Sequence, residues 1–363
     1  MYQIPLPDFY ERLEGQGLHD FIAQKKSQLK DDLIILGHHY QRDEVICHAD
    51  VTGDSLKLAR AAAKVSDKRW VVFCGVHFMA ETADILTSDV QQVALPDMRA
   101  GCDMADMAQA RDVKRAWNEA VAAGLKDIIP ITYVNSTAAL KAFVGDHGGI
   151  VCTSGNAEQA IAWARARGKH VFFFPDQHLG RNISKRMGLD PERDMVLWEP
   201  EKVLGGVSPE LLQETSVWLW RGHCPVHAMF TLKQIAQVRT AYPQMKIMVH
   251  PECAMEVVDA ADMIGSTEQI IAKIAASPVG SEWAVGTEKH LVERLAAQFP
   301  DRKIVSLNPY TCLCGTMNRI SGKHLAWVLG EIADRGEMPN IIRVEPEVAA
   351  SAKLALDRML ELH

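Results

Sequence analysis

Short apolar runs alternate with longer helical stretches over most of the chain. The run at 34–41, IILGHHYQ, has the length and composition of a strand, and the stretch 104–124, MADMAQARDVKRAWNEAVAAG, that of a helix leading to the next strand. Such alternation is typical of βα units, which build parallel sheets covered by helices. We therefore expect an α/β fold.

The expected strands fall into a cycle of four that is repeated three times. In each cycle the first strand ends in a polar cluster, the second in small hydroxyl-bearing residues that open a helix, and the fourth at a cysteine. The first strands are IILGHHYQ (34–41), IIPITYVN (128–135) and IMVHPEC (247–253); the second end in TGDS (52–55), CTSGN (152–156) and GST (265–267); the third are VVFCGVH (71–77), VFFFPDQH (171–178) and WAVGTE (283–288); the fourth are LPDMRAGC (95–102), WLWRGHC (218–224) and LNPYTCLC (307–314).

The first and third cycles have the same spacing, whereas the second is longer. In both of these cycles 17 residues separate the first-strand histidine from the hydroxyl residue, and 47 separate that residue from the cysteine. In the second cycle the last interval is 70, and we assign the excess of 23 to the irregular stretch 181–210. The marker residues are His38, Ser55 and Cys102, then Tyr133, Ser154 and Cys224, then His250, Thr267 and Cys314.

This repeat predicts three pseudo-symmetric domains, each a three-layer α/β/α unit around a mostly parallel, four-stranded sheet. We place the domains at 31–125, at 126–244 with the insertion near 181–210, and at 245–336, after a helical lead-in (1–30) and before a C-terminal helical segment (337–363). Ligands of parallel α/β sheets bind beyond the carboxyl ends of the strands, where all twelve polar clusters lie. If the domains face a common centre, one cysteine from each meets there.

Cys102, Cys224 and Cys314 occupy equivalent positions in the three cycles. A role as small buried core residues does not explain this equivalence. Three thiolates can bind zinc or an iron–sulfur cluster, and three ligands from distant segments leave one metal position open for substrate. The interval of 64 residues from the first-strand histidine to the cysteine favours Cys314 over Cys312. We expect Cys47, Cys74 and Cys152 to be small core residues and Cys253 to neighbour the pocket.

The remaining clusters supply polar groups. Ser55, Ser154 and Thr267 each open a helical stretch, which N-capping alone explains for any one of them. Their equivalence favours a second role, since helix N-termini bind phosphate and carboxylate. The first-strand ends add proton donors and acceptors for catalysis. These residues are His38, Tyr40, Tyr133, Asn135, His250 and Glu252.

Composition narrows the class of protein. The chain of 363 residues has a formal charge of -7, and its Lys and Arg residues are not clustered, which argues against a nucleic-acid partner. The N-terminus does not resemble a secretory signal, and no run approaches the ~18 apolar residues of a membrane span. We expect a cytoplasmic protein, where eight cysteines serve as buried thiols, ligands or redox groups rather than disulfides.

Taken together, the motifs resemble those of the quinolinate synthase family. They are GHHYQ, GDSL, PDMRAGCDMADM, TYVNS, CTSGNA, PDQHLGRN, GHCPVH, HPEC, GST and CGTMNRI, in this order from about 34 to 320. The resemblance implies three pseudo-symmetric α/β domains around one [4Fe–4S] cluster per chain, held by Cys102, Cys224 and Cys314 with one open iron. The insertion and Cys312 are similar to features of the longer members.

The resemblance also implies the reaction. Iminoaspartate, delivered by aspartate oxidase with a possible transient contact, condenses with dihydroxyacetone phosphate to give quinolinate for NAD biosynthesis. Tyr40, Glu252 and His250 would be catalytic. Substrate would be bound by His38, Ser55, Tyr133, Asn135, Ser154, His250, Glu252 and Thr267. Two alternatives stay open: another [4Fe–4S] hydro-lyase acting on a small carboxylate, and a non-enzymatic iron–sulfur sensor.

Overall fold

Three sheets in the computed structural model, which describes residues 2–310 and 313–362, share one strand order. In each, the first strand of the cycle pairs with the second on one side and the third on the other, and the fourth pairs with the third, all in parallel. The pseudo-symmetric α/β architecture is therefore confirmed. The strands are β1 (Leu33–His38), β2 (Val51–Gly53), β3 (Trp70–Cys74) and β4 (Gln92–Ala94); β5 (Ile128–Tyr133), β6 (Ile150–Cys152), β7 (His170–Phe174) and β9 (Val217–Trp220); β10 (Lys246–Val249), β11 (Met263–Ile264), β12 (Glu282–Gly286) and β13 (Lys303–Ser306).

The prediction of four strands per sheet is correct for the third sheet and wrong for the other two. A fifth strand, β14 (Ile341–Ile342), pairs antiparallel with β4 at the edge of the first sheet. In the second sheet the insertion contributes β8 (Met195–Trp198), which pairs with β9. Both additions lie on the edge next to the fourth strand, so they leave the shared four-strand order intact.

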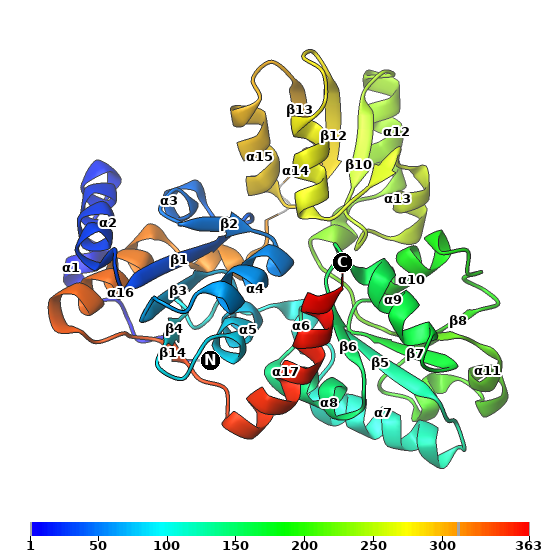
Figure 1. Ribbon diagram of the computed structural model, residues 1–363. Helices are drawn as coiled ribbons and strands as arrows, with labels where there is room; N and C mark the ends of the chain where they lie inside the picture. The colour runs from blue at the N-terminus through cyan, green and yellow to red at the C-terminus, as the bar shows by residue number, and fades with distance from the viewer. Residues whose placement is uncertain (1, 311–312, 363) are drawn as a thin grey trace. The chain divides into compact units, whose positions relative to one another are not determined.

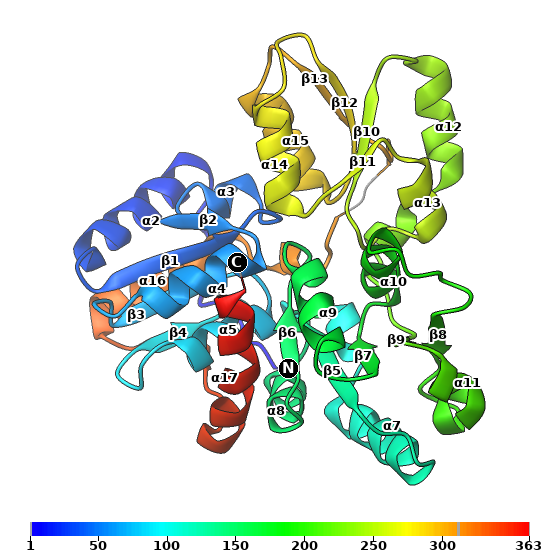
Figure 2. The ribbon, with the colours of Figure 1, turned by 45° about the vertical axis from the view of Figure 1, so that its right-hand side comes forward.

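The middle strands of the two five-stranded sheets are buried along their whole length, which explains their continuous apolar sequences. All five residues of β3 and of β7 are buried. Strands covered by helices on both faces have this composition, because neither face meets water. The third sheet shows the layers most clearly, with α14 (Thr267–Ala275) and α15 (Lys289–Gln298) on one face and α12 (Leu232–Ala241) and α13 (Met255–Ala260) on the other (Figures 1 and 2).

The described chain forms two compact units. Unit 1 contains the first sheet and is built from 1–102 and 313–345; unit 2 contains the other two sheets and is built from 103–312 and 346–363. The predicted domain boundaries stay a proposal. We change them in one respect, because residues 313–345 belong to the unit that contains the first sheet. None of the helices within the described residues is long and apolar enough to cross a membrane.

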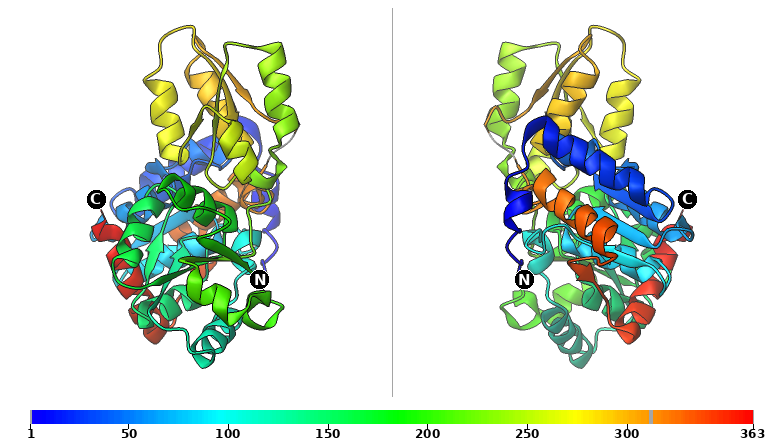
Figure 3. Two further views of the ribbon diagram at one scale, coloured as in Figure 1. Left: turned by 90° about the vertical axis from the view of Figure 1, so that its right-hand side faces the viewer. Right: turned by 90° about the vertical axis from the view of Figure 1, so that its left-hand side faces the viewer.

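In unit 1 the C-terminal part of the chain packs against the N-terminal helices. α16 (Gly322–Arg335) lies alongside α2 (Gly15–Leu29), as the right panel of Figure 3 shows. Lys25 Nζ of α2 pairs with Asp334 Oδ1 of α16 at 2.5 Å. The other helices of unit 1 are α1 (Asp8–Glu11), α3 (Asp43–Ile46), α4 (Ser55–Lys64), α5 (His77–Leu86) and the 3₁₀ turn η3 (Met317–Arg319).

In unit 2 the second and third sheets are joined through α10 (Gln177–Arg186). The Asn182 side chain donates hydrogen bonds of 2.8 Å to the carbonyl oxygens of Pro251 and Cys253, which follow β10. These bonds fix the carboxyl end of β10 against the second sheet. The other helices of unit 2 are α6 (Asp103–Asp106), α7 (Ala110–Ala122), α8 (Ala138–Asp146), α9 (Ala157–Arg165), α11 (Pro209–Glu214), α17 (Pro346–Glu361) and the 3₁₀ turns η1 (Val203–Gly206) and η2 (His227–Met229).

The C-terminal helix α17 packs closely on α8 in unit 2 (Figure 1). Gly145 of α8 makes this approach possible, because a Cβ there would lie 1.9 Å from the carbonyl oxygen of Ser351. The Arg358 side chain of α17 also donates to the carbonyl oxygen of Gly149 at 2.5 Å. The predicted C-terminal helical segment is thus an integral part of unit 2.

Candidate functional site

The first and third sheets repeat the same backbone turn at the carboxyl end of their first strand. His38 is the last residue of β1, and its Nδ1 accepts a hydrogen bond from the Tyr40 N–H at 3.1 Å. His250 follows β10 directly, and its Nδ1 accepts from the Glu252 N–H at 3.4 Å. The two histidines therefore hold Tyr40 and Glu252 in equivalent turns, as the sequence repeat predicts.

Capping is carried out by the residues that precede the predicted hydroxyl residues, so the capping role expected for Ser55 and Thr267 is wrong. Asp54 caps α4 by accepting from the Lys57 N–H at 3.0 Å, and Ser55 is the first helical residue. Ser266 caps α14 in a capping box with Gln269, and Thr267 is again the first helical residue. The Ser55 and Thr267 hydroxyls therefore do not cap these helices.

Ser154 departs from this pattern. It lies in the turn between β6 and α9, ahead of the N-cap residue Asn156. It also lines a cavity of about 370 Å³ whose described lining includes Arg186 and Lys273 but neither Tyr133 nor Glu252. Arg186 and Lys273 outnumber the one carboxylate of this lining, Glu158, and their charges favour a carboxylate or phosphate ligand.

The cysteine-bearing segments of the three cycles share a register with the helices that follow them. Cys102, Cys224 and Cys314 each lie eight residues before the first residue of a long helix, namely α7, α12 and α16. A short helical turn fills each interval: α6, η2 and η3. Cys314 fits this register and Cys312, which lies outside the described residues, would be two residues away from it.

Exposure separates the cysteines into two groups. Cys102, Cys224 and Cys314 are partly exposed. Burial raises the pKa of the Cys74 thiol to about 12 and raises that of Cys152 as well, so both are inert core residues as predicted. The same prediction is wrong for Cys47, which is exposed, because it is the C-cap residue of the short helix α3 and not part of a strand. The predicted pocket neighbour Cys253 is buried directly after Glu252.

Unit 1 holds five of the predicted site residues in two connected segments. Tyr40 packs edge-on against the buried His38 ring, with the ring centroids 4.7 Å apart. The next two residues tie this turn to the one after Cys314, because Gln41 donates to the Met317 carbonyl oxygen at 3.3 Å and Arg42 to that of Asn318 at 3.0 Å. The five residues are His38, Tyr40, Ser55, Cys102 and Cys314.

The segment before Cys102 is fixed to the same helix that follows Cys314. The buried Asp97 carboxylate lies 3.4 Å from Nε2 of His324 in the first turn of α16 and accepts from the Arg99 guanidinium at 2.8 Å. Burial raises the pKa of Asp97, but the bonds from Arg99 and the charge of His324 outweigh it, so the pKa is lowered. Asp97 is therefore an anion. It links the segment that carries Cys102 to the start of α16, the helix that follows Cys314.

Unit 2 brings together a second group centred on Glu252. The buried Glu252 Oε2 lies 2.7 Å from Nδ1 of His227 and 3.9 Å from Nδ1 of His250, and the rings of these histidines stack with centroids 4.3 Å apart. The Cys224 sulfur, a ring nitrogen of His227 and a carboxylate oxygen of Glu252 all lie within 4.8 Å of one another. The predicted residues in this unit are Tyr133, Asn135, Ser154, Cys224, His250, Glu252 and Thr267.

The hydrogen bonds around Glu252 favour its ionised form. Burial by itself raises the pKa of Glu252, but the histidine charges and the hydrogen bonds from His227 and Tyr133 lower it below the ordinary value. Burial, together with the nearby His227, lowers the pKa of His250 to about 3, so His250 is neutral at pH 7. At neutral pH the hydrogen bonds from His227 and Tyr133 are therefore the main support of the carboxylate, which can accept a proton.

Two residues of this group were missed by sequence reasoning. His227 lies three residues after Cys224, and that Cys-x-x-His spacing was the available signal. Asp176, fully buried after β7, caps α10 by accepting from the His178 and Leu179 N–H groups at 2.7 and 2.8 Å. Burial and the Glu252 charge raise the pKa of Asp176, while backbone N–H groups including that of Cys224 lower it. No sequence signal distinguished Asp176 from an ordinary N-cap.

The three repeated α/β sheets, with thiols, imidazoles and carboxylates after their strands, define an α/β protein of the class whose ligands bind beyond the carboxyl ends of parallel strands. The chain belongs to the quinolinate synthetase A family, whose model matches residues 21–361. Membership suggests an iron–sulfur cofactor in general terms and small-molecule substrates.

Similar proteins extend over nearly the whole chain. A quinolinate synthase of Anoxybacillus flavithermus is 53% identical over 98% of this chain and 96% of its own length. A quinolinate synthase of Corynebacterium glutamicum is 52% identical over 98% of this chain and 90% of its own length. One from Streptomyces coelicolor is 52% identical over 93% of this chain and 86% of its own length.

Proposed function

We propose that this protein is a quinolinate synthase that condenses iminoaspartate with dihydroxyacetone phosphate to form quinolinate, phosphate and water in NAD biosynthesis. The observation that carries the proposal is identity of about half the residues, over almost the full length, to proteins named quinolinate synthase. A transient contact with aspartate oxidase, which would supply the unstable imine, is part of the same proposal.

Cys102, Cys224 and Cys314 would hold one [4Fe–4S] cluster. The residues fit such a group because these three thiols are partly exposed and share one register, whereas Cys74 and Cys152 are buried with raised pKa values. Soft thiolates are the usual ligands of iron–sulfur clusters. When bound through three cysteines, the cluster would supply an iron with an open position that acts as a Lewis acid in dehydration.

Glu252 would take up the proton that must leave carbon before the pyridine ring can close. Its lowered pKa makes it a carboxylate at neutral pH, and His227 fixes one of its oxygens. Tyr40 would donate a proton to the departing hydroxyl, because a phenol with a pKa near ~10 carries its proton at pH 7. His250, neutral and stacked on His227, would hold the turn that carries Glu252.

The hydroxyl residues would bind the anionic groups of the substrates. Ser55 and Thr267 are the first residues of helices capped by Asp54 and Ser266, and the N-terminus of a helix favours an anionic group. Ser154 lines a cavity together with Arg186 and Lys273, whose charges would favour phosphate or carboxylate there. His38, Tyr133 and Asn135 would complete the binding surface.

An anaerobic assay tests the proposal. Protein with a full cluster is supplied with dihydroxyacetone phosphate and freshly generated iminoaspartate, and quinolinate is measured by chromatography. We expect quinolinate from the wild type, and a loss of at least ~100-fold in turnover with retained iron for Glu252→Gln, the range a general base contributes. A fully loaded wild type that forms no quinolinate would overturn the proposal in favour of another hydro-lyase.

A further inference from the structure

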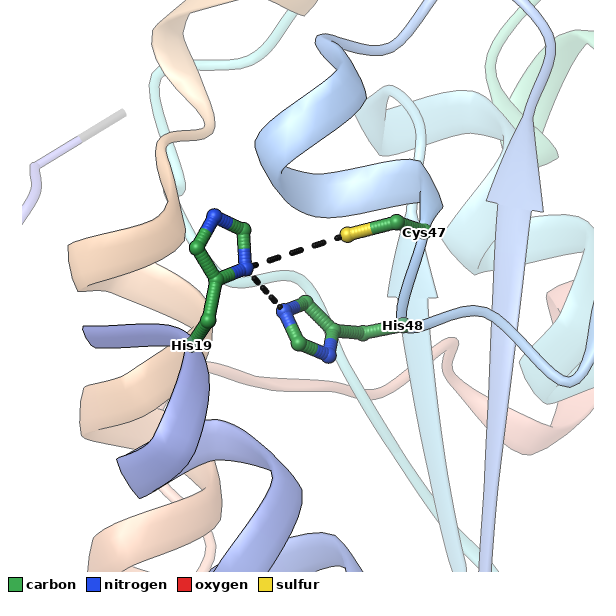
Figure 4. A group of neighbouring side chains, drawn as sticks. All are labelled: His19, Cys47 and His48. Atoms are coloured by element: carbon green, nitrogen blue, oxygen red, sulfur yellow. Dashed lines mark hydrogen bonds between the residues drawn. The ribbon is translucent and has the colours of Figure 1, made fainter. Parts of the chain in front are cut away.

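A group of metal-binding side chains lies in unit 1 outside the residues assigned to the reaction. Nδ1 of His19 lies 2.9 Å from Nε2 of His48 and 4.0 Å from the sulfur of Cys47 (Figure 4). The three donor atoms all lie within 4.8 Å of one another. We propose that His19, Cys47 and His48 form a second metal site, which binds zinc through two imidazoles and one thiolate.

The donor geometry is close to that of a tetrahedral zinc ion. With Zn–N bonds of about 2.05 Å and a Zn–S bond of about 2.3 Å, tetrahedral angles place two nitrogens about 3.3 Å apart and nitrogen and sulfur about 3.5 Å apart. The observed separations of 2.9 and 4.0 Å each differ from these by roughly half an ångström. Small side-chain rotations therefore convert the group into a three-coordinate set with a fourth position open to water.

The backbone around the site is held by contacts that do not involve the donor atoms. On α2, Lys26 donates to the His48 carbonyl oxygen at 2.7 Å and pairs with Asp50 at 2.6 Å. Asp50 in turn accepts from the Ile35 N–H of β1 at 2.8 Å. These bonds fix the loop 47–50 between α2 and β1, so the donors approach one another without a metal having to order the loop.

The donor types suit a zinc ion, because two imidazole nitrogens and one thiol sulfur converge here. Cys47 is exposed, so its thiol can reach a cation from solvent. Zinc is the choice among common cations because mixed imidazole and thiolate donors suit zinc better than the oxygen-seeking magnesium or calcium.

The position of the site indicates a structural role. Cys47 and His48 precede β2, whereas Ser55 follows that strand, so the zinc site and the proposed substrate-binding serine lie beyond opposite ends of β2. His19 belongs to α2, which also packs against α16. Zinc would join α2 to the loop before β2 and thereby fasten the N-terminal helix to the first sheet.

The test uses cluster-loaded protein, kept anaerobic, equilibrated with zinc and freed of unbound metal. We expect the wild type to retain a single zinc ion per chain with no loss of iron, and anomalous diffraction at the zinc edge to place it among His19 Nδ1, Cys47 Sγ and His48 Nε2. Zinc should also raise the wild-type unfolding temperature. His48→Asn and Cys47→Ala should weaken zinc binding by at least about 10- to 100-fold, the range that loss of even an outer partner of a ligand produces.

His147→Asn is the matched control, because His147 is a partly buried histidine on unit 2 that should leave zinc binding and the stabilisation by zinc unchanged. Equal zinc content in wild type and His48→Asn would overturn the proposal. So would an anomalous peak at another position, or zinc uptake that displaces iron, since either would locate the metal at the cysteines proposed for the cluster. Because quinolinate formation is measured separately, failure of the zinc site leaves the proposed activity untouched.

Discussion

His227 Nδ1 and Glu252 Oε2 lie 2.7 Å apart in the interior of unit 2, and the other ring nitrogen of His227 lies 3.2 Å from the Thr287 hydroxyl. The two residues lie in loops of different sheets. His227 belongs to η2, which follows β9 of the second sheet, and Glu252 follows β10 of the third. The pair therefore couples the proposed base to the turn that begins at Cys224.

Loss of His227 should change the pH dependence of catalysis. Hydrogen bonding lowers the pKa of Glu252, the proposed base, so removing the His227 donor should raise that pKa. In His227→Asn the acidic limb of the kcat/KM profile should move to higher pH, with activity lost first at the acid end. Tyr133→Phe removes the other donor and should shift the limb in the same direction, whereas His147→Asn should leave it in place. An unmoved limb in both site variants would remove Glu252 from the role of base.

Buried neutral histidines should make the fold sensitive to mild acid. Burial lowers the pKa of His178 from 6.5 to about 4, so below pH 6.5 the unfolded chain binds a proton that the folded protein does not. Stability then rises with pH through this window and falls as the pH drops below 6.5, by up to ~1.4 kcal/mol per pH unit for one such group. His178→Gln should flatten the slope of unfolding free energy between about pH 6.5 and 5. Urea unfolding at several pH values measures it, and parallel slopes would contradict the prediction.

Replacing a proposed cluster ligand should abolish the broad absorbance near ~400 nm typical of thiolate-bound iron–sulfur clusters. We expect this for Cys102→Ser, Cys224→Ser and Cys314→Ser. Cys47→Ser is the matched control, because Cys47 is also accessible yet lies outside the shared register. Iron and sulfide assays after anaerobic reconstitution check the result. If Cys314→Ser kept a full cluster and Cys312→Ser lost it, the third ligand would be Cys312 and the assignment of Cys314 would be wrong.

Asp54 and Ser55 are neighbours whose replacement should have separable effects. Asp54→Ala removes the cap of α4 and should lower the free energy of unfolding by about 1 kcal/mol. Ser55→Ala leaves the cap in place and should instead weaken binding of the anionic substrate by roughly tenfold or more, as expected for loss of a hydrogen bond to a charged group. Unfolding curves and steady-state kinetics on both variants decide the matter. A Ser55→Ala variant with normal kinetics and lowered stability would return Ser55 to a structural role.

The repeated part of the fold could be read from sequence because each strand is a continuous apolar run with a distinctive end. β14 could not, since a two-residue edge strand has no apolar pattern of its own and forms only by pairing with β4. The capping error came from Asp54 and Ser266, because adjacent Asp, Ser and Thr residues satisfy the same preference. Cys47 was predicted to be a core residue because it lies near an expected strand, whereas it ends the short helix α3 and is exposed.

The site residues that lie at equivalent strand ends could be predicted from the sequence. The residues that form hydrogen bonds or electrostatic contacts with them could not. His227 and Asp176 act through contacts between connections of different sheets, which have no fixed spacing in the sequence. Whether Cys102, Cys224 and Cys314 meet at one cluster stays a prediction for the cysteine variants to test.

The order in which the chain enters its two units bears on how it is made. Unit 1 takes α16 and β14 from residues 313–345, and unit 2 takes α17 from the final segment. During synthesis, unit 1 lacks α16 and β14 until residues 313–345 have left the ribosome, and unit 2 lacks α17 until the segment after them has followed. The surface of α2 that α16 covers is therefore exposed in the nascent chain until α16 has been synthesised. Such transient exposure promotes aggregation. Removal of α17 therefore affects unit 2. A truncation that also removes β14 and α16 takes elements from both units.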